Sequence, residues 1–261
     1  MTRTPIFPDL SQIPAQYHAL MTSAPVFDSS CSPVATVYFI DRDNGYYLKS
    51  APKDSLASEA ALTRFFHEKG LATEILDYYS ADRDWMLSAA VPGEDCVYAD
   101  YLAEPKRLCD LLSSLLRNLH DTNAAGCPVQ DHRTSYLSRT EEGYRSGTFA
   151  PRYLPEAMRQ MAAQDVWNIV ENGRHLFKAD TLLHGDYCLP NIMLNDWKFS
   201  AFIDLGNGGI GDRHVDLYWG AWSLARNLST DSYRNRFFDG YGRDKIDPDM
   251  LTIVAACETF G

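Results

Sequence analysis

Three oxygen-bearing side chains lie close together in the sequence around residue 190. Asp186 and Asn191 are five residues apart, and Asp204 follows thirteen residues later at the end of an apolar run. Transfer of a phosphoryl group from a nucleotide needs a carboxylate that holds the attacking hydroxyl in line, and oxygen ligands that hold Mg²⁺ against the phosphates. We therefore expect Asp186 to be the catalytic carboxylate and Asn191 and Asp204 to be the metal ligands.

A nucleotide also needs a cation at its phosphates, and Lys49 at the end of a predicted strand supplies one. Glu59, on the helix predicted to follow, is placed to fix the ammonium by an ion pair. The alternative explanation for Lys49 and Glu59 is an ordinary surface salt bridge. Ser32, at the end of a short polar run before the first of these strands, is our first choice for a contact to phosphate oxygens.

The first ninety residues contain the elements that must position Lys49 and Glu59. An alternating apolar and polar pattern on both sides of Asp43-Asn44-Gly45 predicts an antiparallel hairpin, because Asn and Gly accept the positive φ of a tight turn. The predicted elements are strands at 35–40 and 46–49, a helix capped by Asp54 or Ser55 and ended by Gly70, and strands at 72–79 and 84–91. Together they predict a small α+β nucleotide-binding lobe over residues 1–91.

The remaining residues, 92–261, predict a mainly helical catalytic and substrate-binding lobe. Leucines between residues 108 and 119 recur at the spacing of a helix with one buried stripe. Residues 130–160 are polar and interrupted by Gly and Pro, so we expect loops and short helices there. Further helices are expected at 165–177, 216–227 and from 230 onward, with a strand leading into Asp204.

Composition narrows the class of partner. The chain has 261 residues and a net charge of −11, which disfavours nucleic acid and favours a cationic small molecule. Its six cysteines show no metal-binding or paired spacing, and no apolar run is long enough for a membrane span. We expect a cytoplasmic protein without a membrane or nucleic-acid partner, as a monomer or weak dimer.

Gly206, Gly208 and Gly211 spell the G-x-G-x-x-G pattern of dinucleotide-binding folds. We reject that interpretation because a Rossmann unit requires further strands, and only about fifty largely helical residues remain. A loop after a metal-binding Asp204 explains the glycines better.

Two segments carry a resemblance to a known family. HGDYCLPNIML, followed by FSAFIDLGNGGIGDRHVDL, resembles the aminoglycoside phosphotransferases, and most closely the aminoglycoside 3′-phosphotransferases. The YYLK hairpin, the SEAAL helix and the RDWML segment resemble the first lobe of the same family. The resemblance implies a two-lobed protein-kinase-like fold with ATP between the lobes. It also implies transfer of the γ-phosphate to an aminoglycoside hydroxyl, which confers antibiotic resistance.

The resemblance assigns the same roles to the five residues above and adds others. The segment Leu87–Ala90 resembles the hinge whose backbone pairs with adenine, through Ser88 and Ala90. His184 and Asp216 match positions that brace the catalytic loop. Either ATP or GTP suits these residues as the phosphate donor.

The resemblance is incomplete where the substrate is expected. Asn207 stands where many 3′-phosphotransferases have an arginine, and Arg226 lies on a helix where the family has acidic residues. Near the C-terminus, Glu258, Phe260 and Gly261 match a segment that reaches the aminoglycoside. Four carboxylates stay open as further contacts to its ammonium groups: Asp131, Glu141, Glu142 and Glu156. Two alternatives are a kinase for a sugar or an amino alcohol, and a nucleotide-binding module without catalysis.

Overall fold

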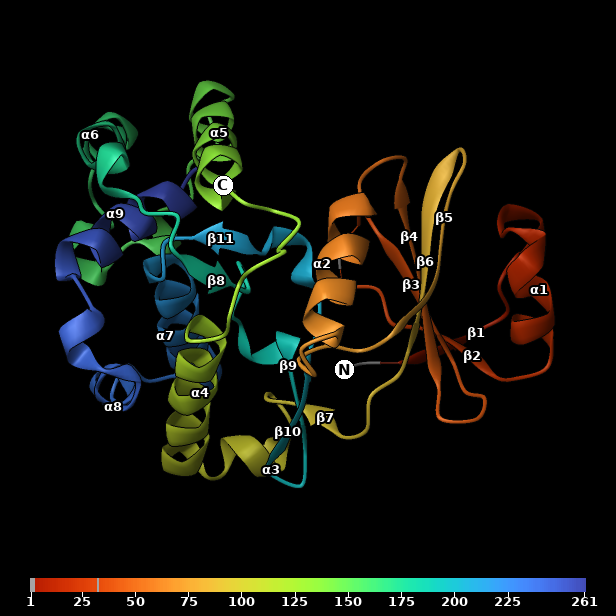
Figure 1. Cartoon of the computed structure of the whole chain (residues 1–261). Coiled ribbons are helices and arrows are strands. Elements are labelled where there is room, and N and C mark those ends of the chain that lie inside the picture. Colours follow the sequence, from red (N-terminus) through yellow and green to blue (C-terminus); the bar gives the residue numbers. More distant parts are fainter. Residues whose placement is uncertain (1–2, 32) are drawn as a thin grey trace. The chain divides into compact units, whose positions relative to one another are not determined.

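The computed structural model describes residues 3–31 and 33–261, which form two compact units (Figure 1). The first unit comprises Met1–Cys96 and Pro190–Gly206, and the second comprises Val97–Leu189 and Asn207–Gly261. The first is built around an antiparallel sheet and the second is mainly helical, in agreement with the predicted α+β class.

An antiparallel sheet with the strand order β1-β2-β3-β4-β6-β5 forms the body of the first unit. Its strands are β1 (Thr4–Ile6), β2 (Val26–Asp28), β3 (Thr36–Ile40), β4 (Tyr46–Pro52), β5 (Ile75–Ser80) and β6 (Arg83–Ala89). The predicted hairpin is confirmed as β3 and β4, in which Ile40 pairs with Tyr46. Gly45 in its turn has a φ of +92°, which explains the need for glycine.

Two helices cover opposite faces of this sheet, α1 (Ala15–Thr22) on one and α2 (Ala57–His67) on the other (Figure 1). Leu48 packs in the cluster that includes Tyr17 of α1, and successive side chains of a strand point to opposite faces. Lys49 therefore points to the face of α2. The sequence pattern of β4 thus determines which helix the lysine meets.

The predicted cap of α2 is wrong. The helix begins after Leu56, and neither Asp54 nor Ser55 forms its cap. Instead, the backbone N–H of Leu56 donates to Asp84, a fully buried carboxylate of β6, over 2.9 Å. A carboxylate distant in sequence satisfies a free N–H of the first turn and makes a local cap unnecessary.

A small second sheet in the first unit has the strand order β10-β9-β7. Its strands are β7 (Glu94–Asp95), β9 (Ile192–Asn195) and β10 (Lys198–Phe202). Asp196 and Trp197 join β9 to β10 with positive φ angles of 47° and 63°, as in the tight turns that fit twisted hairpins. Ile192 pairs with Phe202, so the residues before β9 and after β10 lie at the same end of the hairpin.

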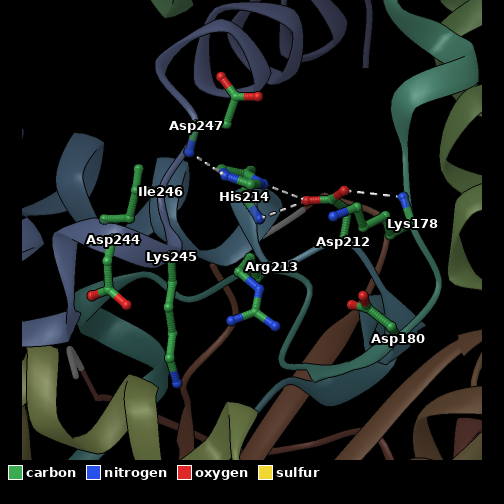
Figure 2. A pocket seen from close by; sticks show the side chains of 9 residues that line it. All are labelled: Lys178, Asp180, Asp212, Arg213, His214, Asp244, Lys245, Ile246 and Asp247. Carbon is green, nitrogen blue, oxygen red and sulfur yellow. Dashed lines mark hydrogen bonds and ion pairs between the residues drawn. The ribbon is translucent and has the colours of Figure 1, made fainter.

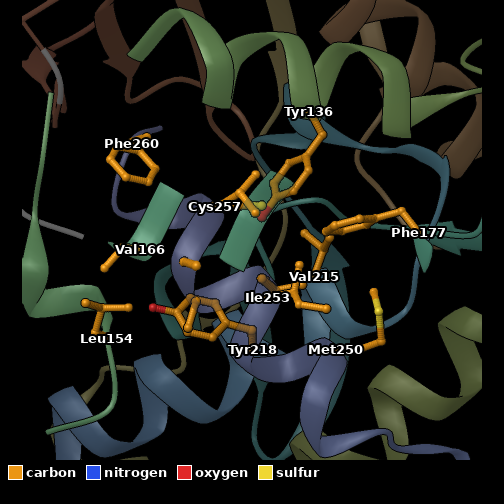
Figure 3. Packing of buried hydrophobic residues seen from close by; sticks show 14 of the residues in the cluster. Tyr136, Leu154, Val166, Phe177, Val215, Tyr218, Met250, Ile253, Cys257 and Phe260 are labelled. Atoms are coloured by element: carbon orange, nitrogen blue, oxygen red, sulfur yellow. The ribbon is translucent and has the colours of Figure 1, made fainter. Parts of the chain in front are cut away.

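Helices make up most of the second unit. They are α3 (Ala99–Leu102), α4 (Pro105–His120), α5 (His132–Arg145), α6 (Ala163–Gly173), α7 (His214–Leu228), α8 (Arg234–Tyr241) and α9 (Pro248–Glu258). The leucine stripe is confirmed in α4, where Leu108, Leu112, Leu116 and Leu119 have no exposed surface. One hydrophobic core cluster of this unit gathers side chains of α5, α6, α7 and α9, among them Tyr136, Val166 and Val215 (Figure 3).

The prediction of loops and short helices at 130–160 is wrong in its first half, where α5 runs for 14 residues. Asp131 caps this helix by accepting a hydrogen bond from the backbone N–H of Thr134. The buried positions His132, Tyr136 and Thr140 recur every four residues. They form a helical stripe made of polar and aromatic side chains, which hydrophobic periodicity does not reveal.

The glycine-rich segment does not build a dinucleotide fold. Gly209–Gly211 form β11, which pairs antiparallel with β8 (Thr181–Leu183) in a two-stranded sheet. A Rossmann unit would need parallel strands at this point.

The six cysteines all lie in the part of the chain that the structure describes. Cys31 is exposed, Cys188 is half-buried, and Cys96, Cys109, Cys127 and Cys257 are buried. None of the helices in residues 3–31 and 33–261 combines the length and apolar character that crossing a bilayer requires.

Candidate active site

Lys49 stands at the centre of a cluster of charges in the first unit. Its Nζ lies 2.8 Å from both carboxylate oxygens of Glu59 and 2.7 Å from Oδ1 of Asp204. The side chains of Lys49 and Glu59 are only 18% and 8% exposed, whereas that of Asp204 is 53% exposed. The ion pair is therefore shielded from water, and the third member of the cluster faces solvent.

The two carboxylates keep Lys49 charged. Burial on its own would lower the pKa of Lys49, but the charges of Glu59 and Asp204 outweigh burial and raise that pKa. Burial raises the pKa of Glu59, and the ammonium opposes this effect. A buried ion pair with two short hydrogen bonds holds the lysine in one place, as binding of phosphate oxygens requires.

Asn191 and Asp204 flank the β9–β10 hairpin of the same unit. The backbone N–H of Ile203 donates to the carbonyl oxygen of Asn191 over 3.0 Å, so the chain just before Asp204 runs beside Asn191. Asp204 has a φ of +60°, which costs a non-glycine residue free energy and is common at functional sites. One amide oxygen and one carboxylate at the same hairpin end are hard donors suited to Mg²⁺.

No group of three or more His, Cys, Asp or Glu side chains that could hold a metal ion occurs among the described residues. Mg²⁺ rarely uses an all-protein cage and instead combines one or two protein oxygens with phosphates and water. The side chains of Asn191 and Asp204 together offer the one or two protein oxygens that this coordination requires.

Asp216 on α7 anchors the segment that contains Asp186, within the second unit. Its Oδ2 and Oδ1 accept hydrogen bonds from the backbone N–H groups of His184 and Gly185, both over 2.8 Å. Nε2 of His120, at the end of α4, lies 3.1 Å from Oδ2. Burial on its own would raise the pKa of Asp216, but the hydrogen bonds from His120 and His184 lower it. This ionised carboxylate has no exposed surface.

Asp186 is accessible within a buried segment. Between residues 181 and 189, every residue except Asp186 and Cys188 is buried. Tyr187 anchors the loop, because its hydroxyl donates to the carbonyl of Leu112 in α4 over 2.8 Å. The backbone N–H of Leu189 donates to Oγ of Ser223 over 3.0 Å. The loop thus presents the carboxylate of Asp186 from a fixed backbone, as a positioning carboxylate requires.

The three C-terminal residues predicted to contact substrate have different surroundings. Oε1 of Glu258 accepts a hydrogen bond from the hydroxyl of Tyr136 over 2.8 Å, and burial raises the pKa of Glu258 to about 7. A Cβ placed on Gly261 would lie 3.8 Å from Oε2 of Glu258, so these two residues are neighbours. Phe260 is 1% exposed, and its ring packs against Tyr144 and Phe149. Its ring is therefore part of the core and offers a ligand no surface here.

The predicted hinge lies at the end of β6. Ser88 pairs with Tyr47 of β4 and with Ile75 of β5, and it is 8% exposed. The backbone N–H of Ala90 donates to the carbonyl of Gly45 over 2.9 Å, so a protein acceptor already occupies this donor. Ser32, predicted to contact phosphate, lies outside the described residues.

Several polar residues expected near the substrate have partners within the second unit. Asp131 caps α5, and Glu141 forms ion pairs with Arg145 and Arg174. The guanidinium of Arg226 lies 5.4 Å from the centre of the Trp222 ring.

Sequence reasoning missed two contacts of this region. His120 braces Asp216 from 96 residues away. Arg139 on α5 donates from Nη1 to Oδ1 of Asn207 over 3.1 Å, where the family pattern has an arginine in place of Asn207. The local motif contains only one partner of each pair, Asp216 or Asn207, so no signal in the sequence identified His120 or Arg139.

A cavity of about 500 Å³ lies on the second unit, next to the start of α7 (Figure 2). Asp212 at its wall accepts hydrogen bonds from the backbone N–H groups of Lys178 and His214, both over 3.0 Å. Nε2 of His214 accepts from the backbone N–H of Asp247 over 2.9 Å. Of the predicted site residues that the structure describes, none lines this cavity. Its polar walls hold the first turn of α7, which carries Asp216.

Comparison with known proteins agrees with this geometry. The family model described as "Phosphotransferase enzyme family" matches residues 33–251. The chain belongs to this phosphotransferase family. A probable aminoglycoside 3'-phosphotransferase of Lactococcus lactis subsp. lactis (strain IL1403) is 44% identical over 258 residues, which cover 97% of each chain. The resemblance to aminoglycoside phosphotransferases is thereby confirmed.

Solved structures of the family share the fold. A crystal structure of an aminoglycoside-3'-phosphotransferase of type VIII has a TM-score of 0.73 at 21% identity, covering 90% of this chain and 91% of that one. Aminoglycoside phosphotransferase APH(3'')-Id from Streptomyces rimosus ATCC10970, in complex with ADP and streptomycin, has a TM-score of 0.71 at 20% identity, covering 98% and 100%. These likenesses confirm the predicted fold class.

Proposed function

We propose that this phosphotransferase moves the γ-phosphate of ATP, or of GTP, to the 3′-hydroxyl of an aminoglycoside and so confers resistance to the drug. The observation that carries the proposal is the shielded Lys49–Glu59 ion pair joined to Asp204, an arrangement suited to nucleotide phosphates. The relative of 44% identity over nearly the whole chain supports the substrate class. A cytoplasmic, monomeric or weakly dimeric enzyme belongs to the same proposal.

In this proposal residues 1–91 bind the nucleotide and residues 92–261 carry catalysis and substrate binding. Lys49 would bind the phosphates, and Asn191 with Asp204 would hold Mg²⁺, which supplies positive charge to the phosphate oxygens. Asp186 would accept a hydrogen bond from the attacking hydroxyl and orient it toward the phosphorus.

The substrate is expected to be a cation. The net charge of −11 attracts polyamines, and Glu258 would supply a carboxylate for an ammonium group near Phe260 and Gly261. Because the pKa of Glu258 is about 7, its negative charge is complete only above neutral pH. The alternative, a kinase for a sugar or an amino alcohol, rests on Asn207 and Arg226 and has less support than the aminoglycoside.

An assay that couples ADP release to NADH oxidation tests this function with a panel of kanamycin-type aminoglycosides. We expect ADP release to depend on the drug, and Asp186→Ala to lower kcat by about 10²–10⁴-fold. The matched control is Asp180→Ala, which removes an exposed carboxylate near the start of β8. Expression in a susceptible bacterium should raise the inhibitory concentration of the drug. Turnover that is independent of every amino sugar tried would contradict the aminoglycoside substrate.

A further inference from the structure

Arg139 lies on the exposed face of α5, where two contacts hold its guanidinium. Nη1 donates to Oδ1 of Asn207 over 3.1 Å. The centre of the Tyr136 ring lies 5.7 Å from the guanidinium carbon, within the range of a cation–π interaction. Tyr136 is itself buried and bonded to Glu258. The guanidinium of Arg139 therefore links the buried Tyr136 to the side chain of Asn207.

The backbone of Asn207 lies directly against Gly185. A Cβ placed on Gly185 would come within 1.7 Å of the carbonyl oxygen of Asn207, so only glycine permits this approach. Gly185 also has a φ of +83°, and its N–H is bound by Asp216. Asp186 is the next residue. A shift of Asn207 therefore acts on the backbone that presents Asp186.

Arg139 is also the cation in a group of acidic residues. Its positive charge lowers the pKa of Glu258, and the negative charge of Asp186 raises it. Gly261 also lies beside Arg139, since a Cβ placed on it would lie 3.8 Å from Nε of Arg139. His132, about two turns before Arg139 on α5, is neutral at pH 7 because burial lowers its pKa to about 4. The positive charge of Arg139 and the negative charge of Asp186 thus both act on the carboxyl group of Glu258.

We propose that Arg139 is a positioning residue for phosphoryl transfer, which holds Asn207 against Gly185 and so fixes the loop of Asp186. This inference rests on the proposed function. Arg139 acts through a neighbour and does not touch the reacting atoms. Its loss should therefore lower kcat with little change in the KM for ATP or for the aminoglycoside.

A double-mutant cycle of Arg139→Ala and Asn207→Ala tests the inference. Each single variant should lower kcat about tenfold, the loss that corresponds to one charge-assisted hydrogen bond. The double variant should lower kcat no further, because both changes break the same link. Arg139→Lys keeps a cation and a donor and should retain more activity than Arg139→Ala. Arg145→Ala, at the end of the same helix and paired only with Glu141 in the described chain, should match the wild type.

Melting temperatures separate a positioning role from a structural one. The Arg139 and Asn207 variants should melt within about 2 °C of the wild type, because both side chains are exposed. Wild-type kcat in Arg139→Ala, additive losses in the double variant, or a change in KM alone would each overturn the inference. If the wild type transfers phosphate to no aminoglycoside, the proposed function fails first and the inference fails with it.

Discussion

Replacement of Asp216 by asparagine tests whether this buried carboxylate holds the loop of Asp186. The side chain of Asp216 has no exposed surface and accepts from two backbone N–H groups at 2.8 Å and from His120 at 3.1 Å. Asparagine has nearly the same shape, but its NH₂ group is a donor. In either orientation, this group faces the backbone N–H of His184 or of Gly185.

The expected loss follows from these contacts. At least one backbone N–H loses its acceptor inside the protein, which costs about 1–3 kcal/mol. The remaining hydrogen bonds lose their charged acceptor, and because a hydrogen bond to a charged group is worth about 1.5–3 kcal/mol, the total loss is about 3–5 kcal/mol. The free energy of unfolding of a typical domain is about 5–15 kcal/mol. We therefore expect Asp216→Asn to lose a large part of the stability, and the melting temperature to fall by roughly 10 °C.

Urea unfolding and kcat measure the two consequences separately. Asp216→Asn should lower the free energy of unfolding by the amount above and should lower kcat at temperatures at which it is folded. His120→Ala keeps both backbone hydrogen bonds and should lose less stability, about 1–3 kcal/mol. Asp231→Asn, an exposed carboxylate paired with Arg234, is the control and should change stability by less than about 1 kcal/mol. An Asp216→Asn protein within 1 kcal/mol of the wild type would refute the reasoning.

Three further predictions follow from the described contacts. Lys49→Met should abolish detectable turnover and cost about 3–5 kcal/mol of stability, because it leaves buried Glu59 without its cation. Adding Glu59→Gln should restore stability but not turnover, as urea unfolding and the ADP assay will show. Burial lowers the pKa of His132 to about 4, whereas an unfolded histidine titrates near 6.5, so the unfolded state binds more protons between these pH values. The free energy of unfolding should therefore fall by about 3 kcal/mol as the pH falls from 6.5 to 4, and His132→Asn should flatten this part of the urea-derived curve; an unchanged curve would contradict the assignment. A Cβ on Gly143 would lie 1.5 Å from the carbonyl oxygen of Phe260, so Gly143→Ala should displace the C-terminal segment and lower the melting temperature by several degrees, whereas an unchanged melting curve would show that the segment moves freely.

Local sequence patterns were enough to predict those parts of the fold that depend on residues close together in the sequence. Alternation and a tight turn predicted the β3–β4 hairpin, and a leucine stripe predicted α4. The chemistry of nucleotide binding was enough to predict the charge cluster, because a lysine that binds phosphates needs a carboxylate to hold its side chain in place. Lys49 and Asp204 are 155 residues apart, yet both were identified through what nucleotide phosphates require.

Other features could not be predicted, because their causes are distant in sequence or chemically ambiguous. The buried stripe of α5 is His132, Tyr136 and Thr140, residue types that also suit loops. Arg139 of this helix donates a hydrogen bond to Asn207, 68 residues further along the chain, and no sequence spacing predicts that contact. The start of α2 depends on a hydrogen bond to a carboxylate on another strand rather than on a neighbouring cap.

The distribution of the cysteines makes the protein easy to label. Burial raises the pKa of the thiols of Cys96, Cys109, Cys188 and Cys257, which keeps them protonated and slow to react at neutral pH. Cys127 is also buried, whereas Cys31, between β2 and β3, is exposed. A maleimide fluorophore added at neutral pH should therefore attach at Cys31, close to the segment predicted to touch phosphate, and could report nucleotide binding without any engineered thiol.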